Sequence, residues 1–559
     1  MKKQLLTLTA MTMLTTVWAQ VTPMVLGEKH AMVRATQEKK YVLLPVQENE
    51  EIAAIAVIDG RNEMVQRINV KLAIDRVDYY VPYELKGARL LDIEFRGDRR
   101  QKGAMGEFVC WKEMKYSDTF DTANREHFRP LYHHTPVYGW MNDPNGMFYK
   151  DGVWHLYYQY NPYGSQWENM HWGHSTSKDL VHWEAQPMTF EPDWLGSIFS
   201  GSCITNGNEV VAFYTSAGHH QTQSMAISKD NGRTFKKYEG NPVITSDKPD
   251  FRDPNVFWYE ATKRWVMILA VGQEMQLYSS DNLKQWKYES SFGQEYGNHG
   301  GVWECPDLIK IGEKWVLLCN INPGGPFGGS ATQYFVGQFD GHKFTCESKP
   351  EVTKWMDYGK DHYATVSFYN APEGRHTVLA WMSNWQYANQ VPTKQFRSAN
   401  SIARDLGLFE YKGETYVSVV PSKEMLAARG QKIVNGKSVN RKLLEACEIV
   451  IDVKKQAEIV LSNAKGEQVT MTYDGQKQTF SMDRTKSGDV SFSQDFPCVT
   501  KAPTYGQIRQ LRIFIDRCSI EAFDAEGKMA MTNLVFPSEP YNNIKVKGGK
   551  ATIYKVKSE

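Results

Sequence analysis

The stretch Trp140-Met-Asn-Asp-Pro-Asn-Gly146 is the segment from which the fold of this chain can be worked out. Taken alone it predicts a turn, because Pro presets φ and both Asn and Gly tolerate positive φ. The residues that follow, 147–149 and 153–158, have the composition of two short strands joined by Asp151-Gly152. This places Asp143 at the mouth of a strand. Local features leave two interpretations of Asp143 open: an Asx-turn residue, or a catalytic group on a sugar-binding surface.

Similar segments recur between Phe128 and Asp405. Five apolar strands are each entered through Trp or a short polar turn, at spacings of 56, 55, 50 and 62 residues; they are residues 154–158, 210–214, 265–269, 315–319 and 377–381. Most are followed by a short strand that leads into a charged or Gly-containing turn and an aromatic residue, at 177–183, 228–235, 280–286 and 339–344. Repeats of this length, each worth about four strands, predict a five-bladed β-propeller over residues 126–415. A solenoid is the alternative, but its repeats are usually shorter.

Each predicted blade also has a strand before its apolar strand, and these first strands share a chemical pattern. They begin near Asp143, Ser200, Asp253, Glu304 and Asp361. The first strand of a propeller blade lies beside the central channel, so acids at or near one register in four of five blades predict four carboxyl groups around one funnel. Turn aspartates scattered by chance would not share a phase with the repeat. The catalytic interpretation of Asp143 is therefore favoured.

The segments on either side of the propeller have the alternating pattern of half-buried strands. Residues 20–122 predict an N-terminal β-sandwich-like module with strands at 41–44, 52–58, 68–74 and 91–95, and a polar linker at 117–125 follows. Residues 422–559 predict a second β-sandwich, with a short helix at 425–429 and strands at 448–452, 457–461, 490–492, 511–516, 520–523 and 553–556. The whole chain is thus predicted to be all-β: a five-bladed β-propeller followed by a C-terminal β-sandwich, with an extra N-terminal β-rich module.

The N-terminus has the pattern of a secretory signal peptide, residues 1–19. Lys2-Lys3 precede an apolar run over 5–18, and Ala19 supplies the small residue for cleavage, so we expect an exported protein, periplasmic or secreted. The run is too short to span a bilayer, and no later stretch approaches about 18 apolar residues. Cleavage would remove two lysines and change the net charge from +1 to −1. A near-neutral protein has no electrostatic basis for binding nucleic acid or an anionic membrane.

The eight cysteines contain no Cys-x-x-Cys pair, which argues against a zinc or redox cluster. We expect mostly buried free thiols. No Ser/His/Asp motif, phosphate-binding loop or His-rich metal pattern stands out either. What remains is the group of carboxylates. Like charges around one pocket cannot all be ionised cheaply, so the pKa of at least one rises and an acid and a base coexist. Glycosidic bond cleavage requires that pairing.

Three motifs give the chain a family resemblance: 140–146, Phe251-Arg-Asp-Pro254 and Trp303-Glu-Cys-Pro306. They resemble the signature motifs of glycoside hydrolase family 32, the invertases, inulinases and levanases. The resemblance runs from about residue 127 to the C-terminus, and the family has a five-bladed propeller followed by a β-sandwich. Two departures stand out. Ala403-Arg-Asp-Leu406 replaces the usual Pro-Arg-Glu-Leu run, and the N-terminal module is not part of the common two-domain pattern.

The resemblance implies a role for each acid. Asp143 would be the nucleophile that forms a covalent fructosyl-enzyme, Glu304 the general acid and then base, and Asp253 a transition-state stabiliser that holds fructose hydroxyls. Because the family retains configuration, the carboxyl groups of Asp143 and Glu304 should lie about 5–5.5 Å apart. The residues implied in substrate binding are Asn142, Gln159, Trp167, Ser200 and Arg252, with Phe199 and Trp385 as apolar walls. The mechanism needs no metal and no cofactor.

Several supporting residues keep a second interpretation. Gln159 could bond strand ends, Trp167 and Trp385 could be core, and Cys305 could either tune Glu304 or only pack. Arg252 could also keep Asp253 ionised. Lys360 and Asp361 could form a rim contact or be solvated turn charges. Four histidines are expected in core or sugar-edge hydrogen bonds; they are His133, His134, His171 and His174.

The expected function is a β-fructofuranosidase that acts on fructans or sucrose and removes terminal fructose. Three alternatives stay open: an endo-acting levanase or inulinase, a fructosyltransferase of similar fold, and a non-catalytic glycan-binding propeller. Intact acids at positions 143, 253 and 304 argue against the last of these. The sequence does not separate β-2,1 from β-2,6 linkage preference, and it does not give the preferred chain length or the oligomeric state.

Overall fold

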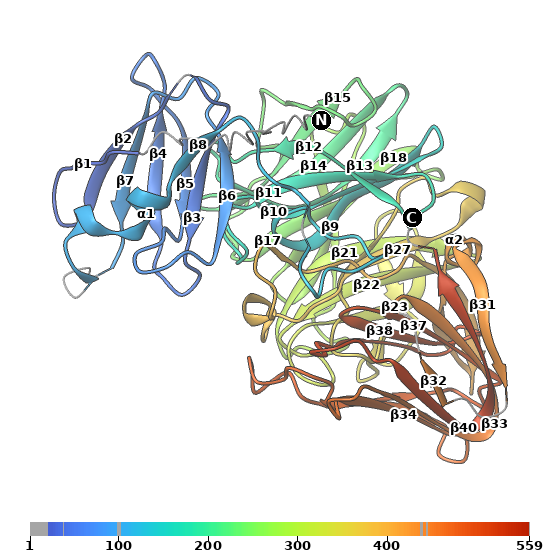
Figure 1. Cartoon of the computed structure of the whole chain (residues 1–559). Coiled ribbons are helices and arrows are strands. Elements are labelled where there is room, and N and C mark those ends of the chain that lie inside the picture. Colours follow the sequence, from blue (N-terminus) through green and yellow to red (C-terminus); the bar gives the residue numbers. More distant parts are fainter. Residues whose placement is uncertain are drawn as a thin grey trace, which may run out of the picture. The chain divides into compact units, whose positions relative to one another are not determined.

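The structure is a computed structural model that describes residues 21–36, 38–97, 102–123, 125–436, 440–442 and 445–557. The predicted signal peptide lies outside these residues. The described residues form two compact units, which divide between Asp121 and Thr122 (Figure 1). Both are built almost entirely from strands, so the prediction of an all-β chain is confirmed.

The first unit contains two antiparallel sheets. One has the order β1-β2-β7-β4-β5 and the other β6-β3-β8. The strands are β1 Met24–Val25, β2 His30–Arg34, β3 Tyr41–Val46, β4 Ala53–Ile58, β5 Met64–Val70, β6 Tyr79–Glu84, β7 Leu90–Phe95 and β8 Lys115–Ser117. A short helix that the sequence pattern did not predict, α1 (Val109–Glu113), places Trp111 edge-on against Phe95 at the end of β7, with ring centroids 6.0 Å apart.

The second unit begins with five sheets, the blades of a propeller (Figure 1). Their strands pair antiparallel, except that the short strand β28 (Phe396–Arg397) pairs parallel with β9 in the first blade. The first strands of the blades are β9 Gly139–Lys150, β13 Ser197–Asn206, β17 Phe251–Tyr259, β21 Val302–Ile311 and β26 Tyr363–Ser367. The second strands, which are the five predicted apolar strands, are β10 Val153–Asn161, β14 Glu209–Ala217, β18 Arg264–Val271, β22 Lys314–Asn322 and β27 Thr377–Trp381. Each first strand contacts the first strand of the next blade, and β26 contacts β9, which closes the ring. The five-bladed propeller is therefore confirmed.

The outer strands complete the blades. They are β11 His171–Ser177 and β12 Trp183–Phe190; β15 Gln221–Ser228 and β16 Lys236–Lys237; β19 Glu274–Ser280 and β20 Lys287–Phe292; β23 Ala331–Phe339, β24 Phe344–Cys346 and β25 Lys354–Trp355; β29 Arg404–Tyr411 and β30 Glu414–Pro421. The segments at 177–183, 228–235 and 280–286 form the connections from third to fourth strand. In each the leading serine Oγ accepts two backbone N–H groups, as Ser177 does from Asp179 and Leu180 at 3.1 and 2.8 Å.

Every first strand carries a β-bulge at one register, and this corrects the prediction of a turn at 140–146. That stretch lies inside β9, where Met141 and Pro144 pair with Tyr160 and Tyr158, so three steps on β9 match two on β10. The other blades repeat this one-residue excess, between 198 and 201, 252 and 255, 304 and 307, and 363 and 366. Turn residues are used here to bend a strand rather than to reverse it, because a bulge also needs unusual φ values.

The C-terminal part of the second unit is a β-sandwich centred on two long strands, β33 (Cys447–Ser462) and β40 (Asn543–Val556), which pair with each other. Its other strands are β31 Arg429–Gly436, β32 Asn440–Lys442, β34 Gln468–Asp474, β35 Thr479–Lys486, β36 Val499–Pro503, β37 Gln510–Asp516, β38 Ser519–Asp524 and β39 Ala530–Leu534. The short helix α2 spans Lys423–Ala427. Two predicted strands, 448–452 and 457–461, are parts of β33, and 490–492 is not a strand.

Buried ion pairs join the last blade of the propeller to the sandwich. Asp361 is fully buried against Arg484, with Nη1 and Oδ2 2.5 Å apart, and its Oδ1 accepts the Tyr387 hydroxyl. Arg404 lies between Asp357 and Glu521, at 2.7 and 2.5 Å. The prediction that Asp361 faces the funnel is therefore wrong. Both interpretations of Lys360 and Asp361, as rim contacts or as solvated charges, fail because both residues are buried.

The cysteines and histidines lie mainly in the core. All eight cysteines are free thiols, and only Cys346 and Cys498 are half-buried. His133 bridges Asp516 and Glu521, while His134 bonds Asn400 and Ser175. His171 and His174 are likewise buried. The four histidines are therefore part of the core, and within the described residues no three His, Cys, Asp or Glu side chains are placed to hold a metal ion.

Candidate active site

The five bulges aim side chains at one end of the propeller channel. The first strands can be aligned on the residue that precedes each bulge. In this alignment Glu304 takes the same position as Arg252 and Tyr363, and Asp253 takes the same position as Cys305. Asp143 is the second inserted residue of its own bulge, the place held by Ser200 in the next blade. The three acids thus take three successive bulge positions on three strands, which gives each a different environment.

Asp143, on β9, is half-buried and accepts three hydrogen bonds. Asn142 Nδ2 donates to its Oδ1 at 3.0 Å, and Ser200 Oγ donates to its Oδ2 at 3.0 Å. The Cys305 thiol lies 3.5 Å from the same Oδ2. Burial, reinforced by the charge of Glu304, raises the pKa of Asp143 to about 6, and the three donors oppose this rise. Asp143 is therefore held as a carboxylate near neutral pH.

Asp253, on β17, is 5% exposed and sits at φ 65°. Its Oδ2 accepts the backbone N–H of Cys305 at 2.8 Å, and its own N–H donates to Thr215 Oγ1 at 2.9 Å. Burial raises its pKa to about 7, with the positive charge of Arg252 opposing the rise and Glu304 adding to it. The expectation that Arg252 favours ionised Asp253 thus holds in sign, but the closest approach of these two groups is 4.0 Å and burial outweighs it.

Glu304, on β21, is held at both carboxylate oxygens. Arg252 donates to Oε1 through Nη2 at 2.9 Å and Nε at 3.3 Å, and the hydroxyl of buried Tyr363 donates to Oε2. Arg252 is fixed in turn by Asp250 at 2.6 Å and by Gln221 at 3.2 Å. The Glu304 side chain keeps 21% of its surface exposed, so it can meet a ligand in the funnel.

Aromatic side chains surround the acids. Trp140 donates through Nε1 to Asn142 Oδ1 at 2.7 Å and stacks on half-buried Trp385, with centroids 5.8 Å apart. Phe199 is half-buried and meets Trp167 edge-on at 6.1 Å. Trp167 is 42% exposed, so its interpretation as plain core is wrong. Trp385 and Phe199 border the buried cluster that contains Cys305 and Tyr363, so both lie close to the acids.

Gln159 lies where its alternative interpretation placed it, whereas Cys305 fits neither of the two interpretations given for it. Gln159 is buried and donates to the Ile198 carbonyl at 3.1 Å, which is a strand-end bond. Cys305 contacts Asp143 and Asp253 rather than Glu304 alone, through its thiol and its backbone N–H. Cys305 is therefore more than packing, and it connects two of the acids.

Tyr363 is the site residue that the sequence interpretation missed. The pattern of strand starts pointed to Asp361 in the fifth blade, whereas the bulge register selects the residue two positions later. Tyr363-Ala364 repeats the placement of Glu304-Cys305, with positive φ at both Ala364 and Cys305, and neither feature can be read from the sequence alone. Thr215, Asp250 and Gln221 gave no sequence signal, because they act through hydrogen bonds to Asp253 and Arg252.

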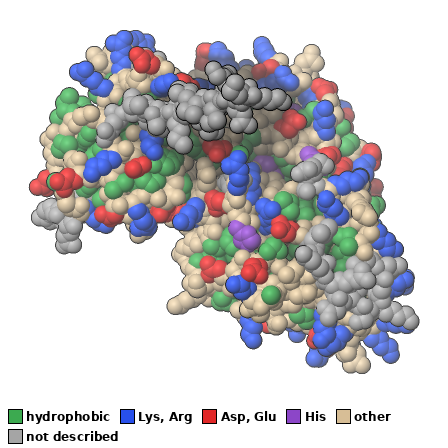
Figure 2. Space-filling model, in the orientation of Figure 1, with side chains coloured by type: hydrophobic (Ala, Val, Ile, Leu, Met, Phe, Trp, Pro, Cys, Tyr) green, Lys and Arg blue, Asp and Glu red, His purple; other side chains and the backbone are tan. Residues whose placement is uncertain are grey.

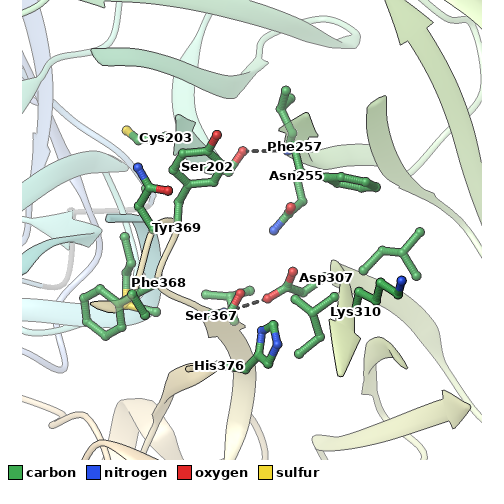
Figure 3. Close-up of a pocket in the computed structure, with 18 of the residues that line it drawn as sticks. Ser202, Cys203, Asn255, Phe257, Asp307, Lys310, Ser367, Phe368, Tyr369 and His376 are labelled. Atoms are coloured by element: carbon green, nitrogen blue, oxygen red, sulfur yellow. Dashed lines mark hydrogen bonds between the residues drawn. The ribbon is translucent and has the colours of Figure 1, made fainter. Parts of the chain in front are cut away.

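A cavity of about 320 Å³ lies further along the same first strands, beyond the acids. Figure 3 shows Ser202, Asn255, Asp307 and Ser367 around this space. Asp307 is buried and accepts the Ser367 N–H at 2.6 Å, and burial raises its pKa to about 6. None of the three acids of the site lines this cavity, so it is separate from the arrangement around Asp143.

The surface carries both signs of charge. Figure 2 shows Lys and Arg side chains interspersed with Asp and Glu on the face drawn, which agrees with a formal net charge of +1. Among the described residues, no helix combines the length and apolar character that crossing a bilayer requires.

Three family models match the chain, and so do several proteins of known function. Residues 133–419 match the glycosyl hydrolases family 32 N-terminal domain, 419–558 match the family 32 C-terminal domain, and 27–132 match a domain of unknown function, DUF4980. A levanase of Bacillus subtilis is 42% identical over 475 residues, which cover 78% of this chain and 70% of that protein. The extracellular exo-inulinase inuE of Aspergillus niger is 37% identical over 74% of this chain and 90% of its own length.

Solved structures show the same likeness. The exo-inulinase of Aspergillus awamori superposes with a TM-score of 0.72 at 33% identity, covering 79% of this chain and all of that one. A fructofuranosidase of Schwanniomyces occidentalis, solved with fructose, gives a TM-score of 0.70 at 33% identity and covers 78% of this chain and all of its own. Both matches span less than four-fifths of this chain.

Proposed function

This chain belongs to glycoside hydrolase family 32, and from that premise we propose that it is a retaining β-fructosidase that releases terminal fructose from fructans, sucrose or both. It is a glycosidase by family. The observation that carries the proposal is that two carboxyl groups of one funnel have different hydrogen-bond partners. Asp143 accepts three hydrogen bonds, which favour its ionised form, whereas Glu304 accepts hydrogen bonds from Arg252 and Tyr363.

In the first step Asp143 attacks the anomeric carbon of the terminal fructose. The bond from that carbon to the leaving oxygen breaks, its electron pair stays on the oxygen, and Glu304 gives that oxygen a proton. Arg252 occupies Oε1 of Glu304 with two donors, so the transferred proton belongs on Oε2, the oxygen beside Tyr363. The product of this step is a fructosyl ester on Asp143.

In the second step Glu304, now a carboxylate, takes a proton from water, and the oxygen of that water attacks the same carbon. The ester bond to Asp143 breaks and its electron pair returns to the carboxylate, which restores the starting enzyme with configuration retained. Asp253 does not form a bond. Its carboxylate, fixed by the Cys305 N–H, would accept hydrogen bonds from fructose hydroxyls as positive charge develops.

The substrate-binding group we propose combines the polar residues Asn142, Gln159, Ser200 and Arg252 with the walls Trp167, Phe199 and Trp385. Support for exo action comes from relatives whose names include exo-inulinase. Endo action and fructosyl transfer are the rival outcomes, and each predicts its own products.

The test is the release of reducing sugar from sucrose, inulin and levan by the folded chain, with product analysis. We expect fructose as the main product from the start of the reaction. Oligosaccharides as first products would indicate endo action, and fructosylated acceptors without free fructose would indicate a transferase. No release from any of the three substrates would leave the non-catalytic glycan-binding propeller as the explanation.

We also propose export through cleavage after Ala19. The extracellular relatives support this assignment. N-terminal sequencing of the protein recovered outside the cytoplasm should then begin at Gln20. Recovery only in the cytoplasm with Met1 intact would contradict it.

A further inference from the structure

Trp194 is the most exposed large hydrophobic side chain among the described residues, at 84%. It lies between β12 and β13, where the chain turns toward the strand that carries Phe199 and Ser200. A single exposed apolar residue is common on protein surfaces, so exposure alone says little. The position of Trp194 and the hydrogen bonds of its loop indicate that this exposed side chain is placed to bind a ligand.

The loop opens on the same end of the propeller as the acids. First strands begin at that end, and Trp194 precedes the start of β13 by three residues. Gly196 packs directly on the backbone of Ala217 and Gly218, since a Cβ on Gly196 would come within 2.3–2.4 Å of their atoms. Three residues further, Gln221 accepts a hydrogen bond from Arg252, which holds Glu304. The loop of Trp194 thus adjoins the segment that reaches the active site.

Hydrogen bonds keep this loop in one conformation. Asp193 and Gly196 exchange backbone hydrogen bonds at 3.2 and 3.0 Å, and Asp193 Oδ1 accepts the Leu195 N–H at 2.8 Å. Lys237, on β16, donates to Asp193 Oδ2 and to the Glu191 carbonyl, both at 2.7 Å. An indole on such a loop is already placed for a ligand, so binding to it costs little ordering entropy.

We propose that Trp194 is a stacking platform for fructosyl units that lie beyond the two sugar residues flanking the scissile bond. The chemistry fits, because the apolar face of an indole packs against the C–H face of a sugar ring while its N–H stays free for a hydroxyl. The proposal rests on the proposed function and adds to it a preference for longer chains. Sucrose, with only two sugar units, would not reach the platform.

The test compares kinetics of the wild-type chain and Trp194→Ala on sucrose and on short inulin-type and levan-type oligosaccharides. We expect KM for the oligosaccharides to rise roughly 3- to 10-fold, with kcat changed by less than about twofold and sucrose kinetics unchanged. Trp194→Phe should keep part of the effect. The matched control is Trp258→Ala, because Trp258 is also exposed but lies at the far end of the first strand β17.

Unchanged oligosaccharide KM, or an equal rise on sucrose, would overturn the proposal. Wild-type turnover of sucrose and of the oligosaccharides reports separately on the proposed function. If none of these substrates is turned over, calorimetric titration of the same oligosaccharides decides whether Trp194 binds them. Binding weakened by Trp194→Ala and not by Trp258→Ala would support the platform, and equal binding would contradict it.

Discussion

The carboxylate of Asp143 shows at the scale of one residue how the site balances burial against hydrogen bonding. Burial and the charge of Glu304 raise its pKa to about 6, and Asn142, Ser200 and Cys305 oppose that rise. Asp143 as nucleophile and Asp253 as stabiliser both have to be ionised. Activity should therefore begin to fall near pH 7, where Asp253 takes up a proton, and should be lost as the pH falls through about 6, where Asp143 does.

Ser200→Ala removes one donor to the ionised form and should raise the pKa of Asp143 further. The acidic limb of the kcat/KM profile should therefore move to higher pH, by up to about one unit. Ser202→Ala is the control, since Ser202 lies two residues along the same strand and faces the distal cavity. An acidic limb that does not move in Ser200→Ala would contradict the assignment of Asp143 to that limb.

Tyr363→Phe tests the clamp on Glu304. The variant loses the donor to Oε2, so the Glu304 carboxyl loses one of the contacts that orient it. We expect kcat to fall about 10- to 100-fold, because proton transfer depends on that orientation. Tyr387→Phe removes a buried tyrosine hydroxyl from Asp361 instead and should lower stability while kcat stays near the wild-type value. Equal kcat for the wild type and Tyr363→Phe would reject the role of Tyr363.

At this scale the sequence predicted the three acids and the influence of Arg252 on Asp253, but it did not predict Tyr363 or Thr215 as partners. Asp143, Asp253 and Glu304 stand in motifs that share the phase of the repeat, whereas Tyr363 and Thr215 act through contacts between blades. Those contacts depend on where each bulge inserts its extra residue, and residue types alone do not fix that position.

At the scale of elements, the bulged first strand is the unit that builds the site. The sequence pattern placed the second strands correctly because their apolar runs are long and regular. It mistook 140–146 for a turn because Asp-Pro and Asn-Gly serve turns and bulges alike. The same ambiguity led to the wrong prediction that Asp361 faces the funnel, whereas Asp361 pairs with Arg484 and joins the last blade to the sandwich.

Arg484→Met tests that anchor. It leaves the Asp361 carboxylate buried without its cation and should lower the free energy of unfolding by about 3–5 kcal/mol, measured by urea denaturation. The double variant Asp361→Asn/Arg484→Met removes the stranded charge and should recover part of the loss. A single variant as stable as the wild type would show that the pair does not hold the two elements together.

At the scale of the whole molecule, the order of elements followed from the sequence because each part has its own periodicity. The junction between propeller and sandwich could not be predicted from the sequence, because its charged residues come from positions nearly 400 residues apart, such as His133 and Asp516. His133 donates to Asp516 and Glu521, and these carboxylates outweigh burial and raise its pKa to about 9.

This raised pKa predicts a pH-dependent stability. The contribution of His133 is complete below its unfolded pKa of about 6.5 and is lost as the pH rises through about 9. The thermal midpoint of the wild type should therefore fall across that range more steeply than that of His133→Gln. Parallel profiles for the two proteins would mean that His133 is not charged in the folded state.

The central claim is that Asp143 forms a bond to fructose, and trapping that bond tests it most directly. Glu304→Ala, given a fructoside whose leaving group needs no protonation, should form the ester and hydrolyse it slowly, because the general base is missing. Mass spectrometry of the acid-quenched, digested protein should then find a hexosyl adduct on Asp143. An adduct on another residue, or rapid turnover with none on Asp143, would contradict the account.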